Sequence, residues 1–143
     1  MSFAGAPAPI NQAEPSRTAS GHTRVIRAAK VQGTSVTNRA HENLGTIRDV
    51  VLDKYDGVVR YAVLEFGGFL GLGSKLFALP WELLRYDEQV DAYVIDIDRQ
   101  VLQNAPGFDS EHWPDMGAAS YDSGLRRHYG LADAAAGYGR PHA

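Results

Sequence analysis

Residues 58–66 form a hydrophobic stretch in the middle of the chain. If this stretch is a strand, it is apolar on both faces. Such a run is typical of a strand that is buried on both sides. A second β-branched stretch, residues 50–53, precedes it, and residues 54–57 lie between the two. The dipeptide Asp56-Gly57 favours a tight hairpin, because glycine adopts positive φ angles without steric cost. The pattern predicts a hairpin whose second strand is central in a curved sheet or barrel.

Two segments before this hairpin also have strand patterns. Residues 36–39 predict a first strand, and residues 43–45 start the next one. Within that second segment Ile47 and Val50 both have the character of buried residues, although strict alternation would place them on opposite faces. A bulge near residues 48–49 reconciles the two.

The pattern continues after the hairpin. Residues 75–81 predict a strand that Pro80 ends, because proline has no N–H to donate to a sheet. Residues 82–84 predict one helical turn, residues 93–98 alternate as a half-buried strand, and residues 99–104 predict a short helix. Short strands with glycine-rich turns favour an all-β fold, a small antiparallel β-barrel of about five to six strands.

The composition along the chain predicts four parts. Residues 1–23 contain little that can be buried, and we expect a disordered arm. Residues 24–104 form the barrel domain, and residues 105–136 form an extension that packs on the barrel or on a partner protomer. Within this extension, residues 122–136 predict a short helix. Residues 137–143 are a small-residue, flexible tail.

Bulk composition excludes several classes of protein. The chain has 143 residues and no cysteine, which excludes disulfides, thiolate metal sites and a cysteine nucleophile. A net charge of −3 disfavours a uniformly basic nucleic-acid binder, although residues 1–40 are net basic and residues 41–116 are strongly acidic. No apolar run approaches the roughly 18 residues of a membrane span, and residues 1–9 lack the pattern of a secretory signal. We therefore expect a soluble, cytoplasmic protein.

Several short segments occur in a fixed order within residues 24–116. They are LGTI (44–47), VVLD (50–53), Gly57, VRYAVL (59–64), FGGFLGLG (66–73), KLFALPW (75–81) and YVIDID (93–98). Together they resemble the PRC-barrel domain, the small barrel shared by the photosynthetic reaction-centre H subunit and ribosome maturation factors. LQNAPGF (102–108) with Trp113-Pro114 resembles the stand-alone bacterial branch of this family. The resemblance implies a β-barrel with no known catalytic residues that is used for binding and assembly.

The glycine-rich residues 67–74 allow two interpretations. A phosphate-binding loop would need Lys followed by Ser or Thr and then a helix, whereas here Ser74-Lys75 opens a strand pattern. The loop also has more apolar side chains than a small domain buries easily, and such a surplus usually marks an interface. We predict these interface residues: Phe69, Leu70, Leu72, Phe108 and Trp113.

No catalytic or cofactor chemistry is predicted. The histidines are scattered without metal-ligand spacing, and no serine lies in a Gly-x-Ser-x-Gly motif. The acidic residues between 87 and 98 lack the spacing of a calcium loop. Glu65, the only acidic residue within an apolar run, is predicted to point outward. We expect no metal, no cofactor and no enzymatic activity.

A modest basic arm includes Arg24, Arg27 and Lys30. It could contact RNA phosphates or an anionic membrane surface, or it could be a solvated segment. The sequence therefore predicts a non-catalytic, homodimeric adaptor with an unidentified protein partner. The alternatives are a ribosome-associated RNA-processing or assembly factor and a membrane-peripheral assembly factor.

Overall fold

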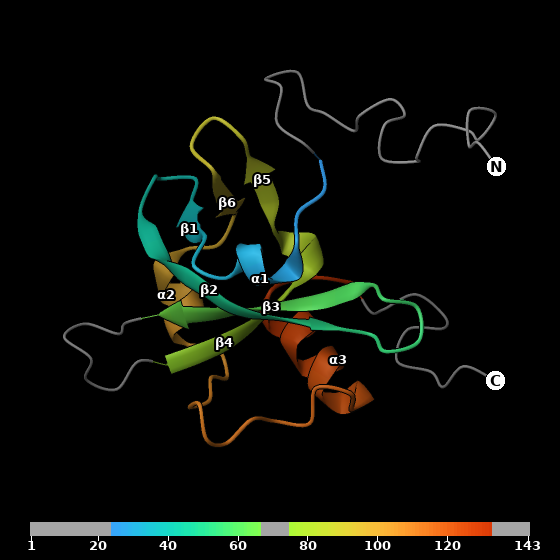
Figure 1. The fold of residues 1–143 in the computed structure, drawn as a ribbon. Helices are drawn as coiled ribbons and strands as arrows, with labels where there is room; N and C mark the ends of the chain where they lie inside the picture. Colours follow the sequence, from blue (N-terminus) through green and yellow to red (C-terminus); the bar gives the residue numbers. More distant parts are fainter. Residues whose placement is uncertain (1–23, 67–74, 133–143) are drawn as a thin grey trace, which may run out of the picture.

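The computed structural model describes residues 24–66 and 75–132 of the chain (Figure 1). Strands account for most of the regular structure. In chain order the elements are α1 (Ala28–Val31), β1 (Ser35–Asn38), β2 (Asn43–Leu52), β3 (Val59–Phe66), β4 (Lys75–Pro80), η3 (Trp81–Leu83), β5 (Arg85–Asp87), β6 (Ala92–Ile95), α2 (Arg99–Gln103) and α3 (Ala119–His128).

The six strands form one mixed sheet in the order β4-β3-β2-β1-β6-β5. Four of the five neighbouring pairs are antiparallel, but β1 runs parallel to β6. The predicted antiparallel barrel is wrong at this pair, because β1 and β6 are separated by four other strands and no hairpin turn imposes their direction. Within the described ranges, the end strands β4 and β5 do not pair with each other, so the sheet is open there rather than closed.

The predicted hairpin and bulge are both confirmed. The N–H of Gly57 donates to the carbonyl of Asp53 at 2.9 Å, and Gly57 has a φ of +74°. The pairing of β2 with β3 shifts register between Ile47 and Asp49. This shift allows Ile47 to be fully buried while Val50 is half-buried against the same core.

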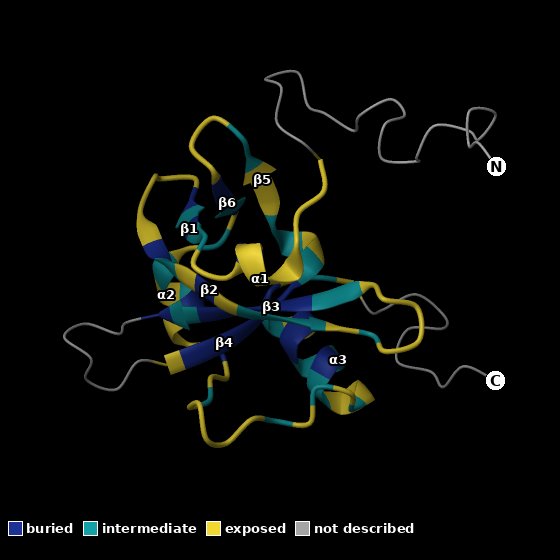
Figure 2. Ribbon diagram, in the orientation of Figure 1, coloured by how far each residue is buried: buried dark blue, intermediate teal, exposed yellow. Residues whose placement is uncertain are grey.

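Strand β3 is buried on both faces (Figure 2). Tyr61, Ala62, Val63 and Leu64 are each at most 2% exposed. Because side chains alternate along a strand, Ala62 and Leu64 face one side, where Phe77 of β4 is aligned with Leu64. Tyr61 and Val63 face the other side. Burying one such large apolar side chain contributes roughly 1.5–3 kcal/mol, so this strand is a main source of stability.

Helix α3 covers the Tyr61 face of β3. The hydroxyl of Tyr61 donates to the Asp122 carboxylate at 2.7 Å, in a buried position, and the rings of Tyr61 and Tyr121 meet edge to face at 6.2 Å. Arg126 donates to the Glu82 carboxylate of η3 at 2.5 Å. These contacts bind the helix to two separate elements of the sheet region, which explains why an apolar run could be buried on both sides.

The predicted helix over residues 122–136 differs from the observed one. Helix α3 spans Ala119–His128, and Gly130 follows with a φ of +73°. The N–H of Leu131 donates to the carbonyl of Arg126 at 2.7 Å, which is a Schellman type of helix end. The glycine therefore ends the helix before the predicted boundary. Residues 133–136 lie outside the described residues.

Smaller elements follow the sequence pattern closely. Helix α2 is confirmed, and η3 begins one residue before the predicted turn at 82–84. Strand β6 ends at Ile95, so the predicted strand over residues 93–98 is too long. Glu65 points outward, as predicted, and pairs with Arg48 at 3.3 Å.

Among the helices that the structure describes, none has the length and apolar character needed to cross a membrane.

Replacing Gly45 tests how closely β2 and β3 approach. Gly45 has a φ of +143°, and a Cβ atom there would lie 2.1 Å from the carbonyl oxygen of Glu65. The strand cannot move away without breaking its pairing. We expect Gly45→Ala to lower the free energy of unfolding by about 3 kcal/mol or more in urea titrations.

The matched control is Gly124→Ala within α3. A Cβ at Gly124 would meet nothing within 4 Å, and the residue is helical. Alanine is the better helix former, so this variant should raise stability by roughly 0.5–1 kcal/mol. Equal effects of the two substitutions would contradict the close approach at Gly45.

The packing of α3 also predicts a pH dependence of stability. The hydroxyl oxygen of Tyr121 is buried without a hydrogen-bond partner in the described structure, and burial raises the pKa of Tyr121 to about 12. An unfolded tyrosine ionises near pH ~10. Between these two values only the unfolded state loses the proton, so the free energy of unfolding falls as the pH rises from about 10 to about 12.

Urea titrations across this alkaline range measure the effect. Tyr121→Phe should make the decline shallower, because phenylalanine keeps the ring and removes the ionisable group. Burial also raises the pKa of Tyr129, so Tyr129→Phe should act in the same direction. A slope that neither variant changes would show that these hydroxyls do not control the alkaline transition.

Candidate interaction surfaces

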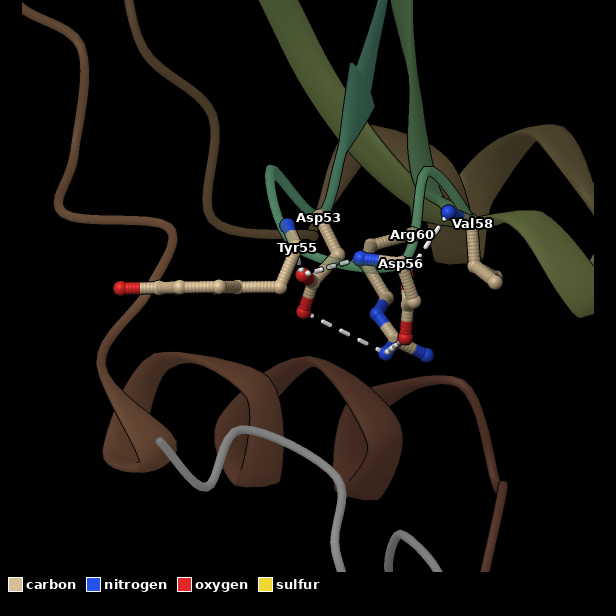
Figure 3. A network of polar contacts seen from close by, with 5 residues as sticks. All are labelled: Asp53, Tyr55, Asp56, Val58 and Arg60. Atoms are coloured by element: carbon tan, nitrogen blue, oxygen red, sulfur yellow. Dashed lines mark hydrogen bonds and ion pairs between the residues drawn. The ribbon is translucent and has the colours of Figure 1, made fainter. Parts of the chain in front are cut away.

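The turn between β2 and β3 is held by a network of polar contacts (Figure 3). The Asp53 carboxylate accepts the backbone N–H of Tyr55 at 2.7 Å and that of Asp56 at 3.3 Å. The Asp56 carboxylate accepts the N–H of Val58 at 2.8 Å. Arg60 binds both carboxylates, at 3.5 Å to Asp53 and 3.1 Å to Asp56. One guanidinium therefore bridges the two carboxylates that order the turn.

This network holds three apolar side chains in water. Tyr55 is 74% exposed, Val58 48% and Leu52 45%. Figure 3 shows the Tyr55 side chain pointing away from the carboxylates and from Arg60. We call residues 52–58 the hairpin tip. An aromatic side chain on an ordered turn is well suited to contact a partner protein, because little conformational freedom is lost on binding.

Sequence reasoning identified the turn but not its exposed surface. The signal available in the sequence was Tyr55 within a turn otherwise made of polar residues and glycine. Exposure could not be derived from it, because a turn aromatic can equally fold back on its own sheet. In the structure the Asp53 carboxylate binds the backbone N–H of Tyr55, and Tyr55 is 74% exposed.

The predicted interface residues fall into two groups. Phe69, Leu70 and Leu72 lie outside the described residues. Phe108 is half-buried, and its backbone makes two hydrogen bonds with Leu76 of β4, at 2.8 and 2.9 Å. The segment before α3 therefore covers part of the free edge of β4, as expected for an extension that packs on its own sheet.

Trp113 is the exposed member of the second group. Its ring lies 5.0 Å from that of Phe108, and its indole N–H donates to the carbonyl of Ser110 at 3.0 Å. Trp113 is still 41% exposed. The structure thus brings Phe108 and Trp113 together, with Phe108 largely used in an intramolecular contact and Trp113 available on the surface.

The basic residues Arg24, Arg27 and Lys30 are all exposed. Between Arg24 and Arg27 lie two aliphatic residues that are exposed as well, Val25 at 74% and Ile26 at 57%. The sequence prediction named only the charges of this segment. Its exposed aliphatic pair could not be recognised from the sequence, because valine and isoleucine at the start of a domain are more often buried.

Asp91, in the turn between β5 and β6, binds a neighbouring tyrosine. Asp91 accepts the hydroxyl of Tyr86 at 2.6 Å, and this hydrogen bond raises the pKa of Tyr86 to about 12. The rings of Tyr86 and Tyr93 lie tilted against each other with their centroids 5.3 Å apart, and Tyr93 meets Trp81 edge to face at 5.4 Å. Across residues 24–66 and 75–132, no three histidine or acidic side chains gather in a way that could hold a metal ion.

Comparison with known proteins supports one family. Residues 24–102 match the family model of the PRC-barrel domain. Among solved structures, the chain is similar to a Pseudomonas aeruginosa protein whose description proposes it as the 16S ribosomal RNA processing protein RimM, with 15% identity and a TM-score of 0.39. That similarity covers 52% of this chain and 45% of the other, so the chain spans less than half of that protein. No curated protein matches the chain.

The order of the hairpin tip can be tested by replacing Asp53. Asp53→Ala removes the acceptor of two backbone N–H groups and one partner of Arg60. We expect faster hydrogen exchange at the Tyr55 amide and a loss of about 1–2 kcal/mol in the free energy of unfolding. Lys54→Ala, at an exposed neighbouring position, should change neither. Unchanged exchange in the Asp53 variant would mean that the carboxylate does not order the tip.

Proposed function

The chain belongs to the PRC-barrel domain family, and from this premise we propose that it is a non-catalytic assembly module, a homodimeric adaptor that holds partner proteins. The observation that carries the proposal is the ordered hairpin tip. It presents Leu52, Tyr55 and Val58 to water on a turn whose backbone is bound by carboxylates. Such surfaces bind without a large ordering cost.

The buried polar side chains support binding rather than catalysis, because each of them already serves the fold. The buried polar residues of the described part are Asn38, Asp122 and Arg126. Asn38 donates to Glu42 at 2.7 Å within the loop between β1 and β2. Asp122 accepts from Tyr61, and Arg126 donates to Glu82. Acid–base catalysis would need such a group to face a substrate instead.

A second copy of the chain is the simplest partner. Small domains bury a limited fraction of their surface, and association of copies is a common way to cover the remainder. The exposed apolar residues at the hairpin tip and at Trp113 offer such surface. A dimer would also present every further binding surface twice, and this bivalency strengthens binding to a multivalent partner.

Light scattering and sedimentation of the full chain test the proposal. The wild-type protein should have the mass of a dimer. Replacing Tyr55 and Val58 by serine should reduce that mass toward a monomer if the tip forms the interface. Leu70→Ser with Leu72→Ser should reduce the mass toward a monomer if the glycine-rich residues 67–74 form the dimer interface. In either case the proposed self-association is supported.

Val90→Ser is the matched control, since Val90 is 65% exposed on the turn between β5 and β6 and is far in sequence from both candidate interfaces. It should leave the mass unchanged. Thermal unfolding of each variant checks that the domain is intact. A wild-type chain that stays monomeric at high micromolar concentration overturns the homodimer.

A further inference from the structure

Residues 24–30 combine exposed positive charge with exposed aliphatic surface. Arg24, Arg27 and Lys30 are exposed, and Val25 and Ile26 between them are 74% and 57% exposed. We call residues 24–30 the basic-aliphatic segment; it is drawn almost entirely as exposed in Figure 2. Leaving two branched aliphatic side chains in water is unfavourable, so this segment is suited to a partner that takes up both kinds of group.

The segment joins the sheet at a defined place. Val31, the last residue of α1, is 5% exposed and belongs to the hydrophobic core. Just beyond it, the N–H of Gly33 donates to the carbonyl of Ile47 at 2.7 Å, and the N–H of Ile47 donates to Thr34 at 2.9 Å. The exposed residues are therefore displayed from one fixed side of the folded domain.

Within residues 24–66 and 75–132, no ion pair involves Arg24, Arg27 or Lys30. The ion pairs among the described residues involve other cations, namely Arg39, Arg48, Arg60, Arg99, His112 and Arg126. Residues 41–116 hold 14 acidic and six basic residues. An anionic surface would attract the basic-aliphatic segment and repel the acidic residues 41–116. This difference in charge would orient the molecule with residues 24–30 toward the surface.

The aliphatic pair discriminates between two anionic partners. Single-stranded RNA is bound by aromatic side chains that stack on bases beside Lys and Arg, and residues 24–31 contain no aromatic residue. A lipid interface instead accepts branched aliphatic side chains at the boundary of headgroups and acyl chains, while Lys and Arg stay at the headgroup level. The composition of the segment fits lipid better than RNA.

We propose that residues 24–30 dock the domain on an anionic phospholipid bilayer. Val25 and Ile26 enter the headgroup–acyl boundary, and Arg24, Arg27 and Lys30 contact the lipid phosphates. Three cations and two aliphatic side chains provide reversible rather than permanent attachment. This surface is separate from the hairpin tip, so membrane docking does not depend on the proposed homodimer, although a dimer would bind more strongly.

Co-sedimentation of the full chain with vesicles tests the proposal. The protein should pellet with vesicles of mixed phosphatidylglycerol and phosphatidylcholine and remain in solution with pure phosphatidylcholine. Raising the salt concentration should weaken the binding, because exposed charges are screened. Val25→Asp with Ile26→Asp should reduce the bound fraction about tenfold or more. Arg24→Gln, Arg27→Gln and Lys30→Gln together should abolish binding.

Val90→Asp is the matched control, because it places the same new charge at another exposed aliphatic position. It should retain most of the binding. Ile26→Trp adds a direct readout: its fluorescence should shift to shorter wavelength on anionic vesicles and be quenched by brominated acyl chains. All variants should keep the wild-type melting temperature, since the substituted positions are exposed.

Three results would overturn the proposal. The first is the absence of binding to anionic vesicles, and the second is equal binding to neutral ones. The third is that the protein binds a single-stranded RNA oligonucleotide and does not bind vesicles. In that case the three glutamine substitutions would abolish RNA binding, and Val25→Asp with Ile26→Asp would leave RNA binding intact. That result would assign the segment to RNA. Light scattering in the absence of lipid reports on the homodimer independently, so the two proposals can fail separately.

Discussion

Strand β3 pairs with β2 along one edge and with β4 along the other, while both of its faces are buried. This arrangement requires a cover on each side. Helix α3 covers the Tyr61 face through the hydrogen bond between Tyr61 and Asp122, and on the other face Ala62 and Leu64 belong to the hydrophobic core. Without the docked helix, the Tyr61 face would expose apolar surface. In the folded domain the Tyr61 hydroxyl is also the partner that makes burial of the Asp122 carboxylate on α3 acceptable.

The hairpin tip is a consequence of the same pairing. At the turn between β2 and β3, Leu52, Tyr55 and Val58 are exposed rather than packed in the core. At that end the stability comes from polar contacts, with Asp53 and Asp56 binding backbone N–H groups and sharing Arg60. The apolar side chains there are left in water, and the order of the turn is what makes them usable for binding.

Two exposed apolar regions therefore differ in chemistry. The hairpin tip carries an aromatic side chain among charges that neutralise one another, which suits a protein surface. The basic-aliphatic segment carries exposed cations on both sides of Val25 and Ile26, and none of them is in an ion pair with another described residue, which suits an anionic interface. A module that assembles proteins at a membrane surface would use both.

The amino-acid sequence alone determined the features that depend on neighbours along the chain. The turn at Gly57, the bulge near Asp49, the strand end at Pro80 and the short helix α2 all follow from local steric rules and side-chain alternation. It also indicated that residues 58–66 are buried on both faces, which is correct for Tyr61 to Leu64 and wrong for Val58, which is 48% exposed. Only the tertiary structure decided what covers them, because contacts such as Tyr61 with Asp122 join residues far apart in the chain. The same holds for the parallel pairing of β1 with β6, and for the exposure of Tyr55, Val25 and Ile26. Direction and exposure are set by which surfaces meet in space, and no local pattern records that.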